Sequence, residues 1–414
     1  MKNKEALKLH EEIKGKLFIG ETIPLEYKNL PLLYTPGVSE PCLKIAEDAN
    51  SVYSLTWKWN SVAVISDGSR VLGLGDIGPL ASLPLLEGKG MIFSKFGGID
   101  AVPLAISQMS VEESVSTIKS IRYSFGAINL EDISIPRCFD ILDRLIEELD
   151  IPVWHDDQQG TATIIVAGLI NALELVGKKL DSVKIILLGA GAANSSVYRL
   201  LRHSGLDAKQ FSVFDKDGIL GSHRKELMDV KVFKTICDET NPKGVNLSVQ
   251  DAVKGADVMI ALSKPGPDVI KPEWIRSMNK DAVVFACANP TPEIDPQLAL
   301  ESGAKIVATG RSDYPNQLNN ALVFPGMMRG ALDVRAKKIT WGMAYAVSKE
   351  IALIAREKGI SADYIVPRID ESQLHFRVAR ATALTAIKEG VAGLPSEGKE
   401  LDHLINKHLF RTDR

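Results

Sequence analysis

The fold is decided by the stretch KIILLGAGAAN, residues 184–194, in which an apolar run passes directly into a glycine-containing turn. The run 184–188 predicts a buried strand, and the pattern after the turn predicts a helix through His203. A strand, a Gly-x-Gly turn and a helix form an arrangement that binds a pyrophosphate, because the helix N-terminus supplies free N–H groups. The third glycine position holds Asn194, so a tight turn without a ligand is the alternative. We expect six turn residues to contact a dinucleotide: Gly189, Ala190, Gly191, Ala192, Ala193 and Asn194.

Around this turn the chain alternates short apolar runs with helical patterns, which is typical of parallel sheets covered by helices on both faces. Strands are predicted in two series, the first at 61–66, 99–104, 127–130 and 151–154, and the second at 184–188, 211–215, 257–261, 282–287 and 305–308. Helices are predicted at 79–88, 110–123, 136–149, 161–176, 339–358 and 371–388. We therefore expect an α/β protein with two domains and a tail: an N-terminal domain with a parallel sheet (1–159), a Rossmann-like doubly wound domain (160–390) and a polar, peripheral tail (391–414).

Composition and charge limit the partners of the chain. Its 414 residues carry a net charge of -3 and contain no basic block, so nothing favours nucleic acid or a membrane surface as a partner. The charged N-terminus, residues 1–16, lacks the apolar core of a secretion signal. The four cysteines are far apart and show no metal-binding spacing: Cys42, Cys138, Cys237 and Cys287. We expect reduced thiols and a cytoplasmic protein.

Two further residues follow strands of the second series, where doubly wound folds bind nucleotides. Asp215 ends the second strand, and its carboxylate can accept hydrogen bonds from both ribose hydroxyls of a dinucleotide. Asn289 lies in the polar turn after the strand 282–287. Asp215 would repel a 2′-phosphate, which favours NAD over NADP. Lys216 follows directly and could offset that repulsion, so both cofactors stay open.

Acidic residues follow two strands of the first series. Glu131 and Asp132 come after 127–130, and Asp156 and Asp157 come after 151–154. If these strands are parallel, four carboxylates meet at one edge of the sheet, where their repulsion raises their pKa values unless a cation lies between them. Oxygen ligands indicate Mg²⁺ or Mn²⁺ over zinc. Acidic residues after strands are often helix caps or solvated turns, and Glu131 with Asp132 alone would be interpreted in that way.

Three residues of the first domain have side chains suited to chemistry. Tyr34 precedes a Pro-Gly turn, Arg70 follows the strand 61–66, and Lys89 lies between two glycines in an apolar run. A lysine in apolar surroundings can have its pKa lowered enough to act as a base. An arginine offers a bidentate fork to a substrate carboxylate. Taken singly, each has an ordinary alternative, as a core tyrosine, a surface ion pair and a solvated charge.

Together these segments resemble the short bacterial and archaeal type of malic enzyme over nearly the full length of the chain. The resemblance is carried by motifs in a fixed order: YTPGV (34–38), SDGSRVLGLGDIGP (66–79), EGKG (87–90), NLEDI (129–133), WHDDQQGTA (154–162), GAGAAN (189–194), SKPG (263–266), ANPTPEI (288–294) and ATGRSDYPNQLNNALVFPG (308–326). So many motifs in order are more specific than the glycine turn alone. The resemblance implies NAD or NADP as cofactor, Mg²⁺ or Mn²⁺ as metal, and L-malate as substrate.

The resemblance also implies roles for individual residues. Glu131, Asp132 and Asp157 would bind the metal, and Asp156 would support Lys89. Lys89 would take the proton from the C2 hydroxyl of malate, and Tyr34 would protonate C3 of the enolpyruvate left after CO₂ departs. Three residues would hold the substrate: Arg70, Asn289 and Asn320. Asn289 would also border the nicotinamide.

Oxidative decarboxylation of malate to pyruvate is the leading hypothesis, and it has three alternatives. A malolactic enzyme would keep the cofactor and release lactate. A 2-hydroxy acid dehydrogenase that does not decarboxylate needs no divalent ion, so the acidic cluster argues against that alternative. A nucleotide-binding sensor without activity would be expected to lack Lys89, Tyr34 or an acidic ligand. The resemblance implies a homodimer or a higher homo-oligomer. Because the sequence ends at Arg414, we expect no regulation through the phosphotransacetylase-like extension of some family members.

Overall fold

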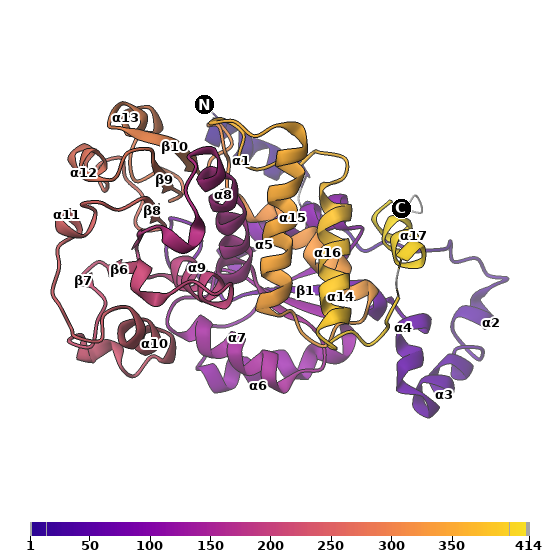
Figure 1. The fold of residues 1–414 in the computed structure, drawn as a ribbon. Coiled ribbons are helices and arrows are strands. Elements are labelled where there is room, and N and C mark those ends of the chain that lie inside the picture. Colours follow the sequence, from indigo (N-terminus) through magenta and orange to yellow (C-terminus); the bar gives the residue numbers. More distant parts are fainter. Residues whose placement is uncertain (1, 14, 397, 411–414) are drawn as a thin grey trace.

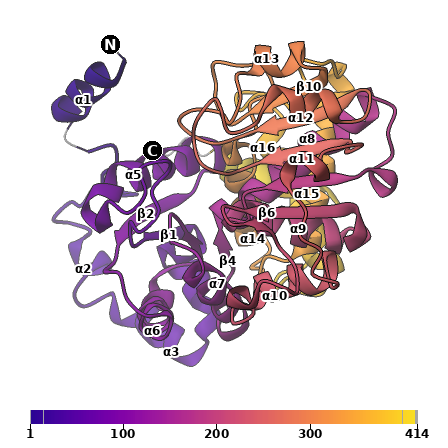
Figure 2. The same ribbon diagram turned by 90° about the vertical axis from the view of Figure 1, so that its left-hand side faces the viewer.

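The computed structural model describes residues 2–13, 15–396 and 398–410, and the end of the predicted tail, 411–414, lies outside them. Two sheets, each in its own lobe, organise the chain (Figure 2). The predicted α/β class with parallel sheets is therefore confirmed. Among the described residues, no helix combines the length and the apolar character needed to cross a bilayer.

The first sheet has the strand order β2-β1-β3-β4, and all of its neighbouring strands are parallel. Its strands are β1 (Ser61–Ser66), β2 (Asp100–Ala105), β3 (Ala127–Leu130) and β4 (Val153–His155). Their bounds lie within two residues of the prediction, because a strand buried on both faces reads as a continuous apolar run. Leu130 of β3 pairs with Ile65 of β1 and with His155 of β4, so three strands end at the same edge.

Helices cover both faces of this sheet: α5 (Gly78–Gly97), α6 (Val111–Ile121) and α7 (Arg137–Glu148). The next helix, α8 (Thr161–Leu175), packs on helices of the second lobe. The predicted end of α5 at Gly88 is wrong, since the helix continues for nine more residues and carries Lys89 on its buried side. Gly90 does not break the helix but admits a neighbour. A Cβ there would lie 2.5 Å from Cδ1 of Leu17. Both glycines of the EGKG motif are thus helical.

The second sheet has the order β10-β9-β8-β5-β6-β7. Its strands are β5 (Ile185–Leu188), β6 (Phe211–Asp215), β7 (Gly218–Ile219), β8 (Val258–Ala261), β9 (Ala282–Ala286) and β10 (Ala304–Thr309). All pairs are parallel except β6 with β7, a two-residue strand too short to show a pattern. The chain leaves β5 for β6 on one side and continues with β8 on the other, so a crevice opens beyond β5.

Helices flank this sheet and join the lobes (Figure 1). They are α9 (Ala192–His203), α10 (Lys231–Thr240), α11 (Val249–Ala252), α12 (Pro272–Ser277), α13 (Pro296–Glu301), α14 (Phe324–Asp333), α15 (Trp341–Lys358) and α16 (Leu374–Lys388). Single 3-10 turns connect several elements: η1 (Ala49–Ser51), η2 (Trp57–Trp59), η3 (Arg122–Ser124), η5 (Leu180–Ser182), η6 (Ala208–Gln210) and η7 (Lys225–Leu227).

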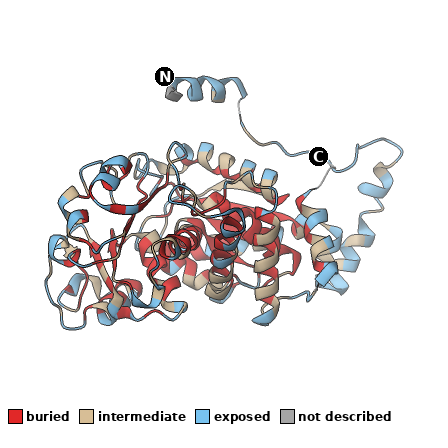
Figure 3. Ribbon diagram, turned by 45° about the horizontal axis from the view of Figure 1, so that its top comes forward, coloured by how far each residue is buried: buried red, intermediate tan, exposed pale blue. Residues whose placement is uncertain are grey.

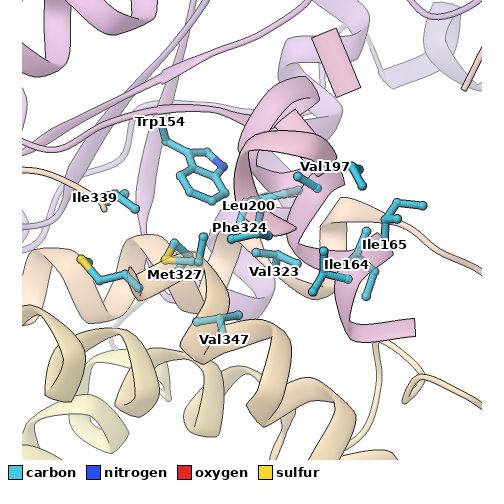
Figure 4. Packing of buried hydrophobic residues seen from close by; sticks show 14 of the residues in the cluster. Trp154, Ile164, Ile165, Val197, Leu200, Val323, Phe324, Met327, Ile339 and Val347 are labelled. Carbon is cyan, nitrogen blue, oxygen red and sulfur yellow. The ribbon is translucent and has the colours of Figure 1, made fainter. Parts of the chain in front are cut away.

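The helix α14 connects the two lobes through one apolar core. The ring of Phe324 lies 4.6 Å from that of Phe93 in α5, so a helix that follows the second sheet packs on a helix of the first lobe. Figure 4 shows Phe324 and Met327 beside Trp154 of the first sheet and Ile164 of α8. The lobes are therefore held against each other by buried side chains and not by a flexible linker.

The prediction of a polar, peripheral C-terminal tail is wrong for the described part of it. Residues of this segment form the helix α17 (Gly398–Leu409), whose Leu401 and Ile405 are fully buried. The helix packs so tightly on the loop after α5 that a Cβ on Gly98 would lie 2.0 Å from the carbonyl oxygen of His408. Apolar residues four apart form a stripe on a helix even where the sequence is polar overall.

The N-terminal segment is the least packed part of the described chain. It forms α1 (Lys2–Ile13), α2 (Leu30–Leu33), α3 (Ser39–Glu47) and α4 (Val52–Leu55). None of the residues of α2, α3 and α4 is buried, and Figure 3 shows α1 extending away from the rest. Its large apolar side chains are exposed: Phe18, Ile19, Ile23, Leu25, Tyr27, Leu32 and Leu43. Large exposed apolar side chains in such number are uncommon on a monomeric protein.

Acid is expected to destabilise the protein partly through His375. This side chain of α16 is buried beside Phe96, and burial lowers its pKa to about 4. The unfolded chain takes up this proton below about pH 6.5 and the folded chain only near about pH 4, so stability is lost between these values. Urea unfolding at about pH 7 and about pH 4.5 should show a loss of roughly 2 kcal/mol that His375→Gln does not share. Equal pH dependence of the two proteins would contradict this.

Candidate active site between the two lobes

The acidic residues lie at the shared edge of β3 and β4. Glu131 and Asp132 directly follow β3, whereas Asp156 and Asp157 begin η4 (Asp156–Gly160), a π-helical turn after β4. Carboxylate oxygens of Glu131, Asp132 and Asp157 lie within 4.8 Å of one another. Lys89 links Glu131 to Asp156, so the four carboxylates form one cluster. Parallel pairing of the two strands brings them there.

The backbone around Asp132 is held by hydrogen bonds in a conformation that side chains rarely adopt. Its φ is +53°, which costs on the order of 1 kcal/mol for a residue other than glycine. The N–H of Arg70 donates to the carbonyl of Asp132 at 3.0 Å, and the N–H of Asp132 donates to Oδ2 of Asp157 at 2.8 Å. These bonds turn the carboxylate of Asp132 toward its acidic neighbours.

Lys89 is inserted into the cluster from α5. Its Nζ donates to Oε1 of Glu131 at 2.6 Å and to Oδ2 of Asp156 at 2.5 Å, and lies 4.6 Å from the centre of the Phe324 ring. Asp156 is fixed in turn by Nε1–H of Trp154, 3.0 Å from its Oδ1. Gly160 leaves room for that carboxylate, since a Cβ there would lie 1.9 Å from Oδ1. Lys89 is thus locked in one position.

The expectation that the pKa of Lys89 is lowered is wrong for this arrangement. Burial alone would lower its pKa, but the carboxylates of Asp156, Glu131 and Asp157 outweigh burial and raise the pKa above its ordinary value. The sequence showed the apolar surroundings of Lys89 and not the three acidic groups that face it. The three carboxylates therefore favour the ammonium form of Lys89.

The carboxylates themselves fit a divalent cation. Burial, then the charge of Asp157, raises the pKa of Asp132 to about 8, and burial also raises the pKa of Glu131 well above its usual range. Oδ2 of Asp132 is buried and has no hydrogen-bond partner among the described residues. Negative charge on these neighbouring carboxylates is costly unless a cation offsets it, and oxygen ligands suit Mg²⁺ or Mn²⁺.

The predicted substrate residues come from both lobes. Arg70 is exposed and close enough to Asp132 to lower that pKa, and Asn320 begins η8 (Asn320–Leu322) beside Gly160, with its Cβ 3.3 Å from where a Cβ on Gly160 would lie. Asn289 follows β9 in the second lobe. A Cβ on Gly73 would lie 2.3 Å from its carbonyl oxygen, so the loops of the two lobes touch. A small substrate would therefore be bound at their junction.

Tyr34 is not brought into this cluster by its own chain. It caps the C-terminus of α2, and 66% of its surface is exposed. Figure 1 places α2 at the outer edge of the molecule, far from α5 with Lys89. The sequence alone gave no sign of this separation.

The glycine turn keeps an open face at the start of α9. Gly189 has a φ of +95° and packs on the next strand, where a Cβ would lie 2.7 Å from the carbonyl oxygen of Leu262. A Cβ on Gly191 would meet nothing within 4 Å, and the helix has no side-chain cap. The expected cofactor contact of the Asn194 side chain is not supported. That side chain is buried and donates to the carbonyls of Leu188 and Ile260, where a third glycine would allow close packing.

An arginine that the sequence analysis missed holds Asp215. The guanidinium of Arg224 makes two hydrogen bonds to its carboxylate, at 3.0 and 2.8 Å. Lys216, which was expected to offset the charge of Asp215, is 88% exposed at its side chain and pairs with Asp217. Arg224 follows nine residues after Asp215, and only the short β6–β7 hairpin brings them together.

Glu293 is a second missed residue, and it ties together two loops that face the first lobe. Its buried carboxylate accepts hydrogen bonds from N–H and Oγ–H of Ser263, at 2.8 and 3.1 Å, and from N–H of Ala288 at 2.9 Å. Ser263 follows β8 and Ala288 precedes Asn289. The available signal was the one charged residue inside the proline-rich ANPTPEI motif.

Glu293→Gln is expected to loosen both loops. Only one oxygen of the amide can accept, and its NH₂ group faces an N–H donor, so we expect a loss of about 2 kcal/mol in the free energy of unfolding. Dinucleotide affinity should fall with it. Urea unfolding and calorimetric titration with NAD measure the two effects, and the exposed Glu301→Gln serves as the control. Unchanged stability of Glu293→Gln would show that its carboxylate does not hold the loops.

Comparisons with known proteins point in one direction. The malic enzyme NAD-binding domain family matches residues 158–387, and the malic enzyme N-terminal domain family matches residues 17–146. An NAD-dependent malic enzyme of Geobacillus stearothermophilus is 47% identical over 92% of this chain and 78% of its own length. A bifunctional malic/malolactic enzyme of Bacillus subtilis is 45% identical over 97% of both chains. An NADP-dependent malic enzyme of Halomonas elongata is 43% identical over 95% of this chain and 96% of its own.

Solved structures give the same result. The malic enzyme of Entamoeba histolytica superposes with a TM-score of 0.94 at 42% identity, covering 98% of this chain and 86% of that one. The malic enzyme of Pyrococcus horikoshii superposes with a TM-score of 0.93 at 46% identity, covering 99% and 96%. The fold and the sequence are therefore similar to malic enzymes across both lobes.

Proposed function

Because the chain belongs to the malic enzyme family, we propose that it catalyses the metal-dependent oxidative decarboxylation of L-malate to pyruvate and CO₂, with NAD or NADP as hydride acceptor. The observation that carries this proposal is the insertion of Lys89 between Glu131 and Asp156, beside three carboxylates that can hold a metal. A plain 2-hydroxy acid dehydrogenase has no need of such a cluster.

The residues around the cluster divide the work of the reaction. Arg70, Asn289 and Asn320 bind and orient malate at the junction of the lobes. Lys89, once neutral, accepts the proton of the C2 hydroxyl, and Asp156 keeps its Nζ directed at that oxygen. The proton returned to C3 after loss of CO₂ comes from a separate acid, for which we propose Tyr34, because Lys89 acts on the hydroxyl at C2.

Glu131, Asp132 and Asp157 would hold the metal and the turn 189–193 the dinucleotide, with Asp215 at its ribose. When bound, a divalent cation would polarise the substrate oxygens and, by neutralising these carboxylates, lower the pKa of Lys89. The dinucleotide would supply the hydride acceptor at the carboxyl edge of the second sheet.

We favour NAD over NADP. The carboxylate of Asp215 can accept from ribose hydroxyls, and its two hydrogen bonds to Arg224 hold it in place for them. Arg224 is itself occupied by Asp215 and Glu226, so it is not free to pair with a 2′-phosphate. A lysine or arginine without such partners would be needed for tight NADP binding.

We further propose that the enzyme is a homodimer or higher homo-oligomer and that Tyr34 completes a site in a second copy. The exposed apolar side chains between Phe18 and Leu43 need a partner, and Tyr34 lies among them, away from Lys89 of its own chain.

A domain boundary near Gly160, at the end of η4, separates the metal-binding lobe 1–159 from the dinucleotide-binding unit 160–390. The cysteines are unpaired, which suits a cytoplasmic protein.

A product assay tests the proposed function. Purified protein is incubated with L-malate, Mn²⁺ and either NAD or NADP, and reduced cofactor, pyruvate and lactate are followed together. Pyruvate formed in step with reduced NAD supports the proposal. Lactate without net cofactor reduction would instead favour a malolactic enzyme. The similarity to a bifunctional malic/malolactic enzyme supports testing this alternative. No product of either kind, with metal and both cofactors present, would overturn both.

Metal binding is expected to depend on Asp157. Asp157→Asn removes one anionic oxygen from the proposed ligand set, so the affinity for Mn²⁺ should fall by about a hundredfold or more. Isothermal titration with Mn²⁺ measures this directly. Asp181→Asn changes the same charge on an exposed turn and should leave affinity unchanged. Equal Mn²⁺ affinity of the two variants would place the metal elsewhere.

A further inference from the structure

A cavity of about 390 Å³ lies where α7 of the first lobe meets the second lobe. The same two helices that contribute to its lining, α7 and α10, also meet through the rings of Phe139 and Phe233, which lie edge to face at 5.6 Å. The lining of the cavity combines apolar side chains with charged ones. Its basic side chains are Arg199 and His203 of α9, Lys231 of α10 and Lys338 before α15.

Arg199 is the best placed of these groups. It lies 5.0 Å over the ring of Trp341 and donates through Nη2 to Oδ1 of Asp143 in α7 at 3.0 Å, which makes an ion pair between the lobes. Its Nη1 is buried and has no hydrogen-bond partner among the described residues. A guanidinium whose second nitrogen is unused can still donate hydrogen bonds to an oxyanion, in the bidentate geometry that arginine favours.

The surrounding charge also favours an anion. Lys231 is the first residue of α10, a helix of ten residues with no side-chain cap, so its free N–H groups and positive dipole end face this region. The lining contains three side chains that carry a permanent positive charge and two carboxylates. The cations are Arg199, Lys231 and Lys338, and the carboxylates are Asp143 and Glu147. One of those carboxylates is the partner that an anion would replace.

We propose that this cavity binds a small, doubly charged oxyanion, either a phosphate or a dicarboxylate, which displaces Asp143 from Arg199. The anion then exchanges an ion pair between the lobes for contacts within the second lobe. Gln159 also lines the cavity, and its Oε1 accepts from the N–H of His155, directly before Asp156. Occupancy is therefore coupled to the loop that holds Lys89, and it should change the KM for malate more than kcat.

Binding is tested on the full chain with NAD and Mg²⁺ present, by calorimetric titration with inorganic phosphate and, separately, with succinate. Lys231→Ala/Lys338→Ala should weaken binding by at least about tenfold, because two of three fixed cations are lost. Asp143→Asn should strengthen it by about threefold to tenfold, because Arg199 is released. Lys209→Ala/Lys305→Ala removes the same charge from exposed positions of the same lobe and should change nothing. The anion that shows this pattern identifies the ligand class.

Two results would overturn the proposal. One is the absence of saturable binding of both anions. The other is equal affinity in the wild type and in Lys231→Ala/Lys338→Ala, which would place the anion at the substrate groove or the glycine turn. The readout is binding to residues outside the proposed active site, so it stands whether or not the protein turns over malate.

Discussion

Lys89→Ala is expected to lower the rate of malate oxidation by about a hundredfold to ten-thousandfold, the range that a positioned proton-transfer group contributes. Lys89 is the one described cation in hydrogen-bond contact with both Glu131 and Asp156, so no neighbouring ammonium can replace it. Initial rates with L-malate, Mn²⁺ and NAD measure the loss. A variant that keeps a tenth of the rate or more would contradict the role of Lys89 as base.

Loss of Lys89 also leaves Glu131 and Asp156 buried without their cation, so the variant should lose stability. Removing one partner of a buried ion pair costs about 3–5 kcal/mol, and bound Mn²⁺ should recover part of it. Lys95→Ala, at an exposed position of the same helix α5, should change stability by no more than about 0.5 kcal/mol and leave the rate unchanged. A small amine added to Lys89→Ala should restore some activity, whereas loss of folding alone would not be rescued.

The predictable parts of this protein are those that depend on one segment at a time. The strands β1, β3 and β6 were predicted to the residue, because burial on both faces leaves an unbroken apolar run. The convergence of Glu131 with Asp157 followed from the rule that parallel strands end at the same edge. In both cases the pattern within a segment, joined to one topological rule, determines the outcome.

The errors arose where distant segments meet. The glycines of α5 suggested that the helix ends, yet Gly90 serves the approach of Leu17, more than seventy residues earlier. The pKa of Lys89 is set by carboxylates from two other elements, and the geometry of Asp215 by Arg224 across a hairpin. Such contacts leave no periodic pattern in the sequence. The residue types therefore indicated which groups take part in the chemistry, but the direction of the pKa shift of Lys89 and the partner of Asp215 could be seen only in the fold.

Tyr34→Phe and Lys89→Ala are each expected to be inactive, but a mixture of the two should regain activity if Tyr34 serves a second copy. In a heterodimer, one site then combines Lys89 of the Tyr34→Phe chain with Tyr34 of the Lys89→Ala chain, and is intact. Random exchange in an equal mixture makes half of the dimers mixed, each with one good site, so about a quarter of the wild-type rate should return. The readout is the rate of NAD reduction after co-refolding.

The matched control is a mixture of Lys89→Ala with Asp156→Asn. Both residues belong to the cluster of one chain, at 2.5 Å from each other, so every site in every dimer keeps a defect and no activity should return. If the Tyr34→Phe mixture also stays inactive, the acid acts within its own chain, and α2 must then move from the position it has here. Recovery in the first mixture and not in the second is explained only by a tyrosine that crosses between copies, which would also account for the exposed apolar side chains around it.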